Sequence, residues 1–233
     1  MILNFGGTMN KDQLMGYIDS LPEDYDEYFK AIPYAKHAIS AFNWYRKRRI
    51  MVFLKSIDVA SNSLQQEDKK KFEKYLNSNT GREILAEYSD SVLRTSSNTA
   101  IAALGILYAD VNNDIYTDDL KRIACRAFEG ATDGLLDSFV LLCDLETKPE
   151  DGPYPLCHLR KEDFEAEQKL QETIGTAEDV FALINELIRR GMLLPDYVPS
   201  RISSKQWFIN YGVTDISIKL KDLIMKAKTY LEA

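Results

Sequence analysis

The fold is decided by the apolar segment Ala100-Ile-Ala-Ala-Leu-Gly-Ile-Leu-Tyr-Ala109, the longest uninterrupted apolar run in the chain. Its ten residues are about half of what a helix needs to span a bilayer, so the segment indicates a helix buried in a globular core. Asn98 precedes the run and is expected to cap this helix. We expect a helical bundle with a core that includes Phe53, Phe72, Leu85, Ile101, Leu104 and Leu107.

Helices are also predicted on both sides of this segment. Apolar residues recur every three, four or seven positions from Tyr34 to Ile57, which is the pattern of a long amphipathic helix. Further along the chain, residues of the kind that cap helix N-termini precede four more helical patterns. The predicted caps are Ser63, Thr80 and Thr117, and the fourth of these helices is expected to begin near Thr132.

The chain changes character at Lys148-Pro-Glu-Asp-Gly-Pro-Tyr-Pro155, where three prolines and a glycine within eight residues predict a loop. The patterns that follow predict helices at 161–173 and 177–190, strands at 192–198 and 206–211, and a final helix at 215–231. This is the order of elements in a winged-helix module, except that the first strand of such a module is missing.

The predicted fold class is therefore mainly α, in two parts. Residues 1–147 are expected to form a helical bundle domain. Residues 148–233 are expected to form a winged-helix-like domain with one small β-hairpin. The helix at 132–145 is compatible with either domain.

The charge and the cysteine content limit the partners and the cellular location expected for the protein. The chain carries 29 Lys and Arg against 36 Asp and Glu, a net charge of −7, which argues against non-specific coating of nucleic acid. The three cysteines include no CxxC pair and do not have the number and spacing of a disulfide-bonded fold. This cysteine content indicates a protein of the reducing cytoplasm. The first residues lack the pattern of a signal peptide, and no run is long enough for a transmembrane segment. We expect a cytoplasmic protein.

The predicted winged helix favours binding of protein over binding of DNA. Its candidate recognition helix opens with Glu178 and Asp179, and carboxylates at that end of the helix repel phosphates. The loop of the wing offers only Arg201 and Lys205 as cations. A DNA-binding regulator that uses these two residues or the basic helix described next remains an alternative.

A basic cluster lies in Trp44-Tyr-Arg-Lys-Arg-Arg49. From residue 34 to residue 56 the chain has no acidic residue, whereas the 33 residues before it carry six acidic and two basic ones. The candidate anion or nucleic-acid contacts are Lys36, Arg46, Lys47, Arg48 and Arg49, together with Arg201 and Lys205. A second alternative is peripheral binding of this helix, 34–55, to an anionic membrane. Consecutive residues point around a helix, however, so this helix could also be a solvated face or a partner of the acidic N-terminus.

Signatures of catalysis and metal binding are weak. Asp110-Val-Asn-Asn-Asp-Ile-Tyr-Thr-Asp118 resembles the start of an EF-hand loop, but Ile115 stands in place of the required glycine and Lys121 in place of the bidentate glutamate. Cys157 and His158 have no second pair to complete a zinc site. We therefore predict no catalytic residue, no metal site and no cofactor, and a protein that is not an enzyme.

A resemblance covers residues 30–145. Several segments follow an order that resembles a group of uncharacterised bacterial helical proteins, which are in turn similar to helical proteins of phage abortive-infection systems. The segments are Ala31-Ile-Pro33, Arg49-Ile-Met-Val-Phe-Leu54, 63–72, 98–109 and 114–120. The resemblance implies a bacterial or prophage-borne helical protein and supplies no catalytic residues. The leading hypothesis is that the chain is a non-enzymatic protein-interaction or regulatory protein that acts in phage defence. We expect a protein partner, and homo-oligomerisation is possible.

Overall fold

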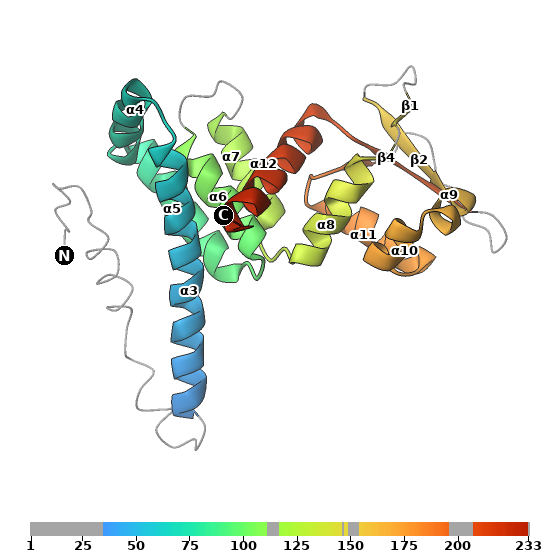
Figure 1. Ribbon diagram of the computed structural model, residues 1–233, viewed down its shortest axis with the longest axis horizontal. Helices are drawn as coiled ribbons and strands as arrows, with labels where there is room; N and C mark the ends of the chain where they lie inside the picture. The colour runs from blue at the N-terminus through green and yellow to red at the C-terminus, as the bar shows by residue number, and fades with distance from the viewer. Residues whose placement is uncertain (1–34, 111–116, 146, 149–153, 196–206, 233) are drawn as a thin grey trace.

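The computed structural model describes residues 35–110, 117–145, 147–148, 154–195 and 207–232 (Figure 1). This part of the chain is mainly α-helical, with a small antiparallel sheet toward the C-terminus. The helices are α3 (Ala35–Asn62), α4 (Gln66–Leu76), α5 (Asn79–Arg94), α6 (Asn98–Ala109), α7 (Asp118–Phe128), α8 (Asp133–Cys143), α9 (Lys161–Ala166), α10 (Gln168–Ile174), α11 (Ala177–Arg189) and α12 (Asp215–Glu232). The strands are β1 (Thr147–Lys148), β2 (Leu156–Arg160), β3 (Leu194–Pro195) and β4 (Phe208–Gly212).

Helix α6 is the centre of the helical part, as its apolar sequence predicts. Every residue from Thr99 to Ala109 is buried, because α3, α5, α7, α8 and α12 pack around the helix. Five of the six predicted core residues are buried, and Leu85 packs half-buried against the same core. The prediction of a buried core helix is confirmed.

Gly105 allows α3 and α6 to cross at short distance. A Cβ atom placed on Gly105 would lie 2.7 Å from the carbonyl oxygen of Phe53 and 2.7 Å from the Cβ of Ser56, both on α3. Real Cβ atoms do not approach other atoms this closely, so only glycine fits at this crossing.

Several helices begin at a different cap from the predicted one. Helix α5 is capped by Ser78, whose Oγ accepts from the Gly81 N–H, and not by Thr80. The cap of α6 is Ser97 rather than Asn98. Gln65 precedes α4, while Ser63 donates its hydroxyl to a carbonyl at the end of α3. In the first two cases the sequence holds two polar residues near the helix start, and the earlier one has the extended backbone that a cap requires. Thr132 and Thr176 cap α8 and α11.

Ser97 also joins two helix ends, which leads to a prediction. Its Oγ accepts from the Ala100 N–H at 2.9 Å and donates to Asp133 Oδ1 at 2.5 Å. Ser97→Ala should lower the free energy of unfolding by about 1–2 kcal/mol, the usual cost of a lost N-cap. Asn98→Ala is the matched control and should cost less than about 0.5 kcal/mol. Urea unfolding of both variants measures the difference, and equal losses would contradict the assignment of the cap.

The sheet has the strand order β1-β2-β4-β3, with every neighbouring pair antiparallel. Strand β2 pairs along its whole length with β4, from Leu156 opposite Gly212 to Arg160 opposite Phe208. The predicted strand at 206–211 is present as β4, whereas the one at 192–198 is reduced to Leu194–Pro195 in the described residues. Strand β2 was not predicted, so the expectation of a single hairpin is corrected to a larger sheet.

The predicted helix 161–173 is two helices, α9 and α10, which meet at Glu167. Glu167 has extended backbone angles and therefore cannot continue the helix. The break leaves carbonyls at the end of α9 without helical partners, and the side-chain amide of Gln171 donates to those of Phe164 and Glu165. Helix α11 ends at Arg189, one residue before the predicted end, and Gly191 follows with a φ of 71°, which suits glycine.

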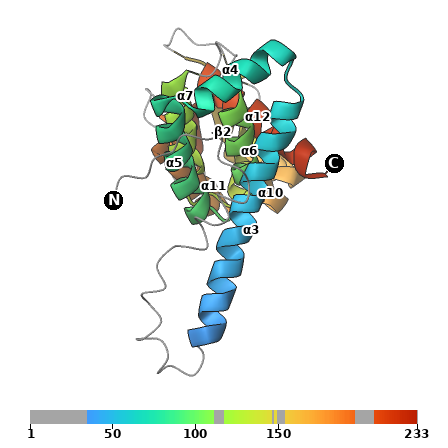
Figure 2. The ribbon, with the colours of Figure 1, turned by 90° about the vertical axis from the view of Figure 1, so that its left-hand side faces the viewer.

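Helix α12 returns from the sheet to the helical part of the molecule (Figures 1 and 2). It packs against α6 and α8. Lys221 and Lys228 pair with Asp144 and Asp137 of the α8 region. The buried residues before and after residue 147 therefore form one continuous core. The division into domains 1–147 and 148–233 stays a prediction.

Candidate interaction surfaces

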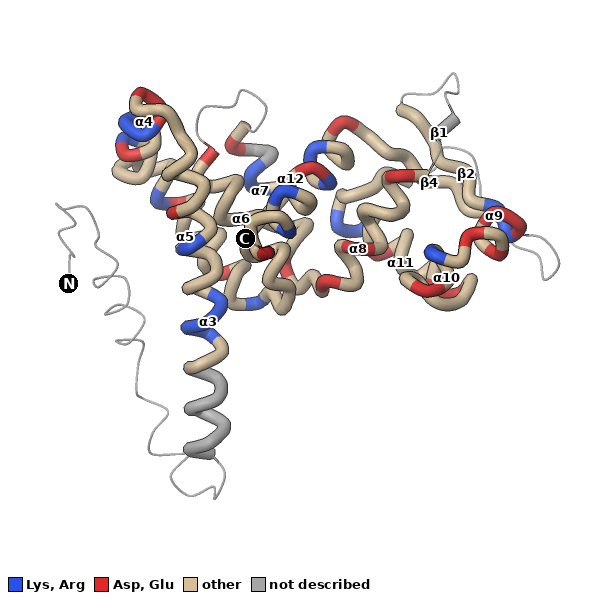
Figure 3. The backbone as a smooth tube through the Cα atoms, viewed as in Figure 1, with Lys and Arg blue, Asp and Glu red and all other residues tan. Residues whose placement is uncertain are grey.

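The basic cluster of α3 does not act as one surface. Helix α3 projects from the body of the molecule, and the lysines and arginines coloured on it lie within the body or where the helix leaves it (Figure 3). Arg46 and Lys47 are half-buried, and each interacts with another group of the protein. Lys36 lies on α3, and its side chain is outside the described residues. The remaining two arginines of the cluster have opposite roles.

Arg49 is a structural residue. Its guanidinium donates to the carbonyl oxygen of Leu93, near the C-terminus of α5, and lies 3.9 Å from the ring centroid of Tyr45. A cation at a helix C-terminus is favoured by the unpaired carbonyls there. One residue earlier, Arg48 is exposed and lies 5.7 Å from the ring centroid of Trp44, which is 62% exposed. Arg48 and Trp44 are therefore the part of the cluster that faces solvent.

The outer face of α11 is acidic. Glu178 and Asp179 are exposed in its first turn, and Asp179 forms a reciprocal capping box with Thr176. The Thr176 hydroxyl donates to the Asp179 carboxylate and so lowers the pKa of that group. Arg201 and Lys205, the predicted cations of the wing, lie outside the described residues.

The two arginines at the end of α11 are held by partners inside the protein. Arg190, with an 11% exposed side chain, donates to the carbonyl oxygens of Ala127 at 3.1 Å and Glu129 at 2.6 Å, at the C-terminal end of α7. Glu186 pairs with Arg190 at 2.7 Å and with the exposed Arg189 at 2.6 Å. Neither arginine is a free cation on the surface.

These pairs lower the pKa of Glu186 to about 2, first through the hydrogen bonds from Arg189 and then through Arg190. An acid whose pKa is lowered in the folded state stabilises the protein above its ordinary pKa, and this contribution is lost as the pH falls toward 2. Glu186→Gln should therefore show a smaller loss of Tm between about pH 5 and pH 2 than the unchanged protein.

The control for this pH series is Glu178→Gln on the same helix, because Glu178 forms no ion pair within the described ranges. Its Tm should follow that of the unchanged protein at every pH. If Tm fell by the same amount between pH 5 and pH 2 with and without the Glu186 carboxylate, the assigned pairing would be contradicted.

The neighbouring elements also pair their cations with acids. Arg160 at the end of β2 binds Asp163 at 2.9 Å, and Lys161 lies 3.6 Å from Glu165. The surface of α9 and α10 carries more acidic than basic residues (Figure 3). The surface around α9, α10 and α11 is therefore unfavourable for the phosphates of nucleic acid.

A pocket of about 490 Å³ lies where α8 ends and α12 begins. Its lining is mostly apolar and comprises Cys143, Leu145, Tyr154, Pro155, Val213, Thr214, Asp215, Ile216 and Ile218. Burial raises the pKa of the Cys143 thiol to about 12, so the thiol stays protonated at neutral pH and is a poor nucleophile. The mostly apolar lining suits an apolar group.

A buried lysine lies among the aromatic residues of the helical part. Lys121 has a 3% exposed side chain, and its Nζ lies 4.6 Å from the ring centroid of Tyr75 and 3.9 Å from Asp118 Oδ1. Burial lowers the pKa of Lys121, and the Asp118 carboxylate opposes this shift. Residues 111–116 of the EF-hand-like segment lie outside the described residues. The cation–π contact and the ion pair hold the start of α7 against α4.

The cysteines and His158, considered above as possible metal ligands or disulfide partners, have structural surroundings in the fold. Cys125, Cys143 and Cys157 are buried free thiols. His158 contacts Asn210 on the neighbouring strand and stacks on Phe208, with ring centroids 4.8 Å apart. In the described ranges no three His, Cys, Asp or Glu residues are grouped to hold a metal ion. No helix of the described chain has both the length and the apolar character needed to cross a membrane.

Comparison with known proteins adds no relative. No protein-family model, no curated protein and no solved structure matches this sequence. The function has to be inferred from the surfaces described above.

Proposed function

We propose that this chain is a non-enzymatic protein-interaction protein, and that its C-terminal part is a winged-helix-like module that binds a protein through the outer face of α11. The order α8, β2, α9 and α10, α11, β3, β4 supports this fold. The sheet supports it too, because β2 supplies the first strand that the sequence pattern lacked and β4 lies between β2 and β3.

The observation that carries the proposal is that the arginines at the end of α11 are paired within the protein, while its first turn presents carboxylates. In many winged-helix proteins the third helix enters the major groove of DNA, where phosphate contacts need free lysines and arginines. In this chain Arg190 binds the end of α7, Arg189 binds Glu186, and the first turn presents Glu178 and Asp179. A partner with a basic surface complements this face better than a polyanion does.

The first experiment tests the DNA alternative. A gel shift with mixed-sequence duplex at about 50 mM salt should show no complex, because the electrostatic part of DNA binding is strongest at low salt. A shift that Arg201→Ala and Lys205→Ala abolish would contradict the proposal and support the DNA-binding regulator.

The second experiment tests the protein contact. A photo-crosslinking amino acid at Asn185, exposed on α11, should yield one crosslinked partner in a bacterial host, and the same group at the exposed Asp222 of α12 should not. Binding of that partner, once purified, should weaken by about tenfold or more in Glu178→Lys. Asp222→Lys makes the same charge change elsewhere and should bind normally. Equal binding by both variants would overturn the assigned face.

The role in phage defence rests on the resemblance to abortive-infection proteins. We expect expression of the chain in a bacterial host to lower the plating efficiency of a susceptible phage. Glu178→Lys should restore plaques, whereas Asp222→Lys should not. If both variants protected equally well, the outer face of α11 would not be needed for phage defence.

A further inference from the structure

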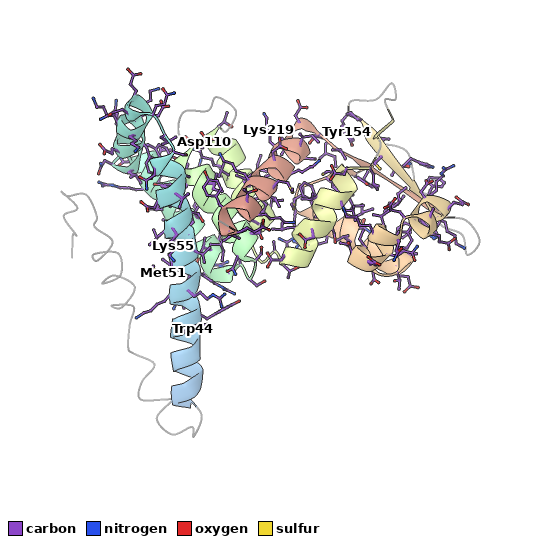
Figure 4. The ribbon with its side chains drawn as sticks, in the orientation of Figure 1. Trp44, Met51, Lys55, Asp110, Tyr154 and Lys219 are labelled. Atoms are coloured by element: carbon purple, nitrogen blue, oxygen red, sulfur yellow. The ribbon has the colours of Figure 1, made fainter. Side chains whose placement is uncertain are left out.

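The projecting part of α3 carries an exposed apolar side chain. Trp44 is 62% exposed, more than any other large hydrophobic side chain in the described residues, and its neighbour Tyr45 is 38% exposed. Trp44 lies on the part of α3 that extends away from the body (Figure 4). An exposed tryptophan with a nearby arginine is the kind of residue pair that dominates protein–protein contacts.

The pocket at the start of α12 is lined mostly by apolar side chains, and no residue that the structure describes fills it. Ile216 and Ile218, 36% and 41% exposed, lie at its edge, and Tyr154 forms a wall that packs against Gly212. Tyr154 is fixed further by its hydroxyl, which donates to the carbonyl of Pro195. The pocket is therefore a formed feature of the sheet and α12.

Trp44 on α3 and Tyr154, which lines the pocket, lie well apart in the view of Figure 4. Trp44 therefore does not reach the pocket of its own chain. Trp44 of one copy can, however, enter the pocket of a second copy. Charge favours this match, because Arg48 lies beside Trp44 and Asp215 lines the pocket. We propose that the pocket receives Trp44 from a second copy of the chain, with Arg48 of that copy facing Asp215.

This contact uses two different surfaces, so after the first pairing one copy still has a free pocket and the other still has a free tryptophan. Such heterologous contacts form rings or open chains, unlike a symmetric dimer. The inference is independent of the partner of α11, because neither Trp44 nor the pocket belongs to the outer face of that helix.

Sedimentation velocity tests the self-association between about 1 and 200 µM, the range of weak homo-oligomers. The unchanged chain should form species larger than a dimer as concentration rises. Trp44→Ala and Ile218→Glu should each remain monomeric throughout. Val59→Ala removes another exposed apolar side chain of α3, 47% exposed, and should associate normally.

Mixing the two monomeric variants gives the sharpest result. Trp44→Ala retains the pocket and Ile218→Glu retains the tryptophan, so the mixture should form a one-to-one dimer that does not grow. Arg48→Asp should weaken association, and Asp215→Arg in the same chain should restore it. Circular dichroism of each variant confirms that it is folded.

Fluorescence gives a second measurement. Trp44 and Trp207 are the two tryptophans of the chain, so Trp207→Phe leaves Trp44 as the only emitter. Its emission should shift to shorter wavelength as concentration rises.

Three results would overturn the proposal. They are a monomer at every concentration, association that Trp44→Ala leaves unchanged, and a Trp44 blue shift that occurs only on phosphatidylserine vesicles. The last result would assign Trp44 and Arg48 to a membrane surface instead.

Discussion

Gly105→Ala should lower the free energy of unfolding by about 2–3 kcal/mol, although it adds only one methyl group in a helix. The added Cβ would meet the α3 backbone at Phe53 and the side chain of Ser56 at distances that no real Cβ atom adopts. Neither contact is with a flexible side-chain end, so α3 and α6 would have to move apart, and α6 is the centre of the core. Gly105→Val should not fold.

Gly134→Ala is the matched control, because a Cβ at Gly134 of α8 meets nothing within 4 Å. Alanine is a better helix former than glycine, so this variant should be unchanged or stabilised by up to about 1 kcal/mol. Urea unfolding of both variants makes the comparison. Equal effects at the two positions would show that α3 and α6 do not cross as closely as described.

Arg190→Met should lower the free energy of unfolding by about 2–4 kcal/mol. The guanidinium of Arg190 satisfies carbonyl oxygens of Ala127 and Glu129 and also pairs with Glu186, while being 11% exposed. Methionine fills much of the same space but donates no hydrogen bond, so these groups lose their partner and α11 loses its connection to α7.

The neighbouring residue provides the control. Arg189 is 70% exposed and binds only Glu186 among the described residues, so Arg189→Met should cost less than about 0.5 kcal/mol. Thermal and urea unfolding at pH 7 distinguish the two arginines. A similar cost for both would mean that Arg190 contributes as a surface charge and not as a link between helices.

The sequence predicted the helical part well because its signals are local and strong. The run from Ala100 to Ala109 is apolar on all sides and can only be a buried helix. Cap positions were less predictable, because Ser97 and Asn98 are both residue types that cap helices well. The structure uses Ser97, which also donates a hydrogen bond to Asp133 of α8.

Strand β2 was missed for a physical reason. Cys157 and Leu159 are buried while His158 is half-buried and Arg160 exposed, so the alternation covers only four residues directly after a proline-rich loop and is too short to predict a strand. Pairing with β4, about fifty residues away in sequence, defines it instead. Patterns read along the chain do not report such long-range partners.

The candidate sites were predictable in composition but not in geometry. Helix periodicity indicates that Arg46 to Arg49 point in different directions, but it does not say which of them points inward. The structure places Arg49 against α5 and leaves Arg48 on the surface beside Trp44. Arg189 and Arg190 are alike in sequence, and only the position of α7 separates them.

The packing of α12 on α6 has a consequence for synthesis in the cell. Helix α6 is complete early in translation, but α12, which covers one of its sides, follows about a hundred residues later. During that interval a strongly apolar helix is exposed on the nascent chain, which is a state prone to aggregation. We therefore expect that a stop codon before α12 gives aggregated chains rather than a smaller folded unit.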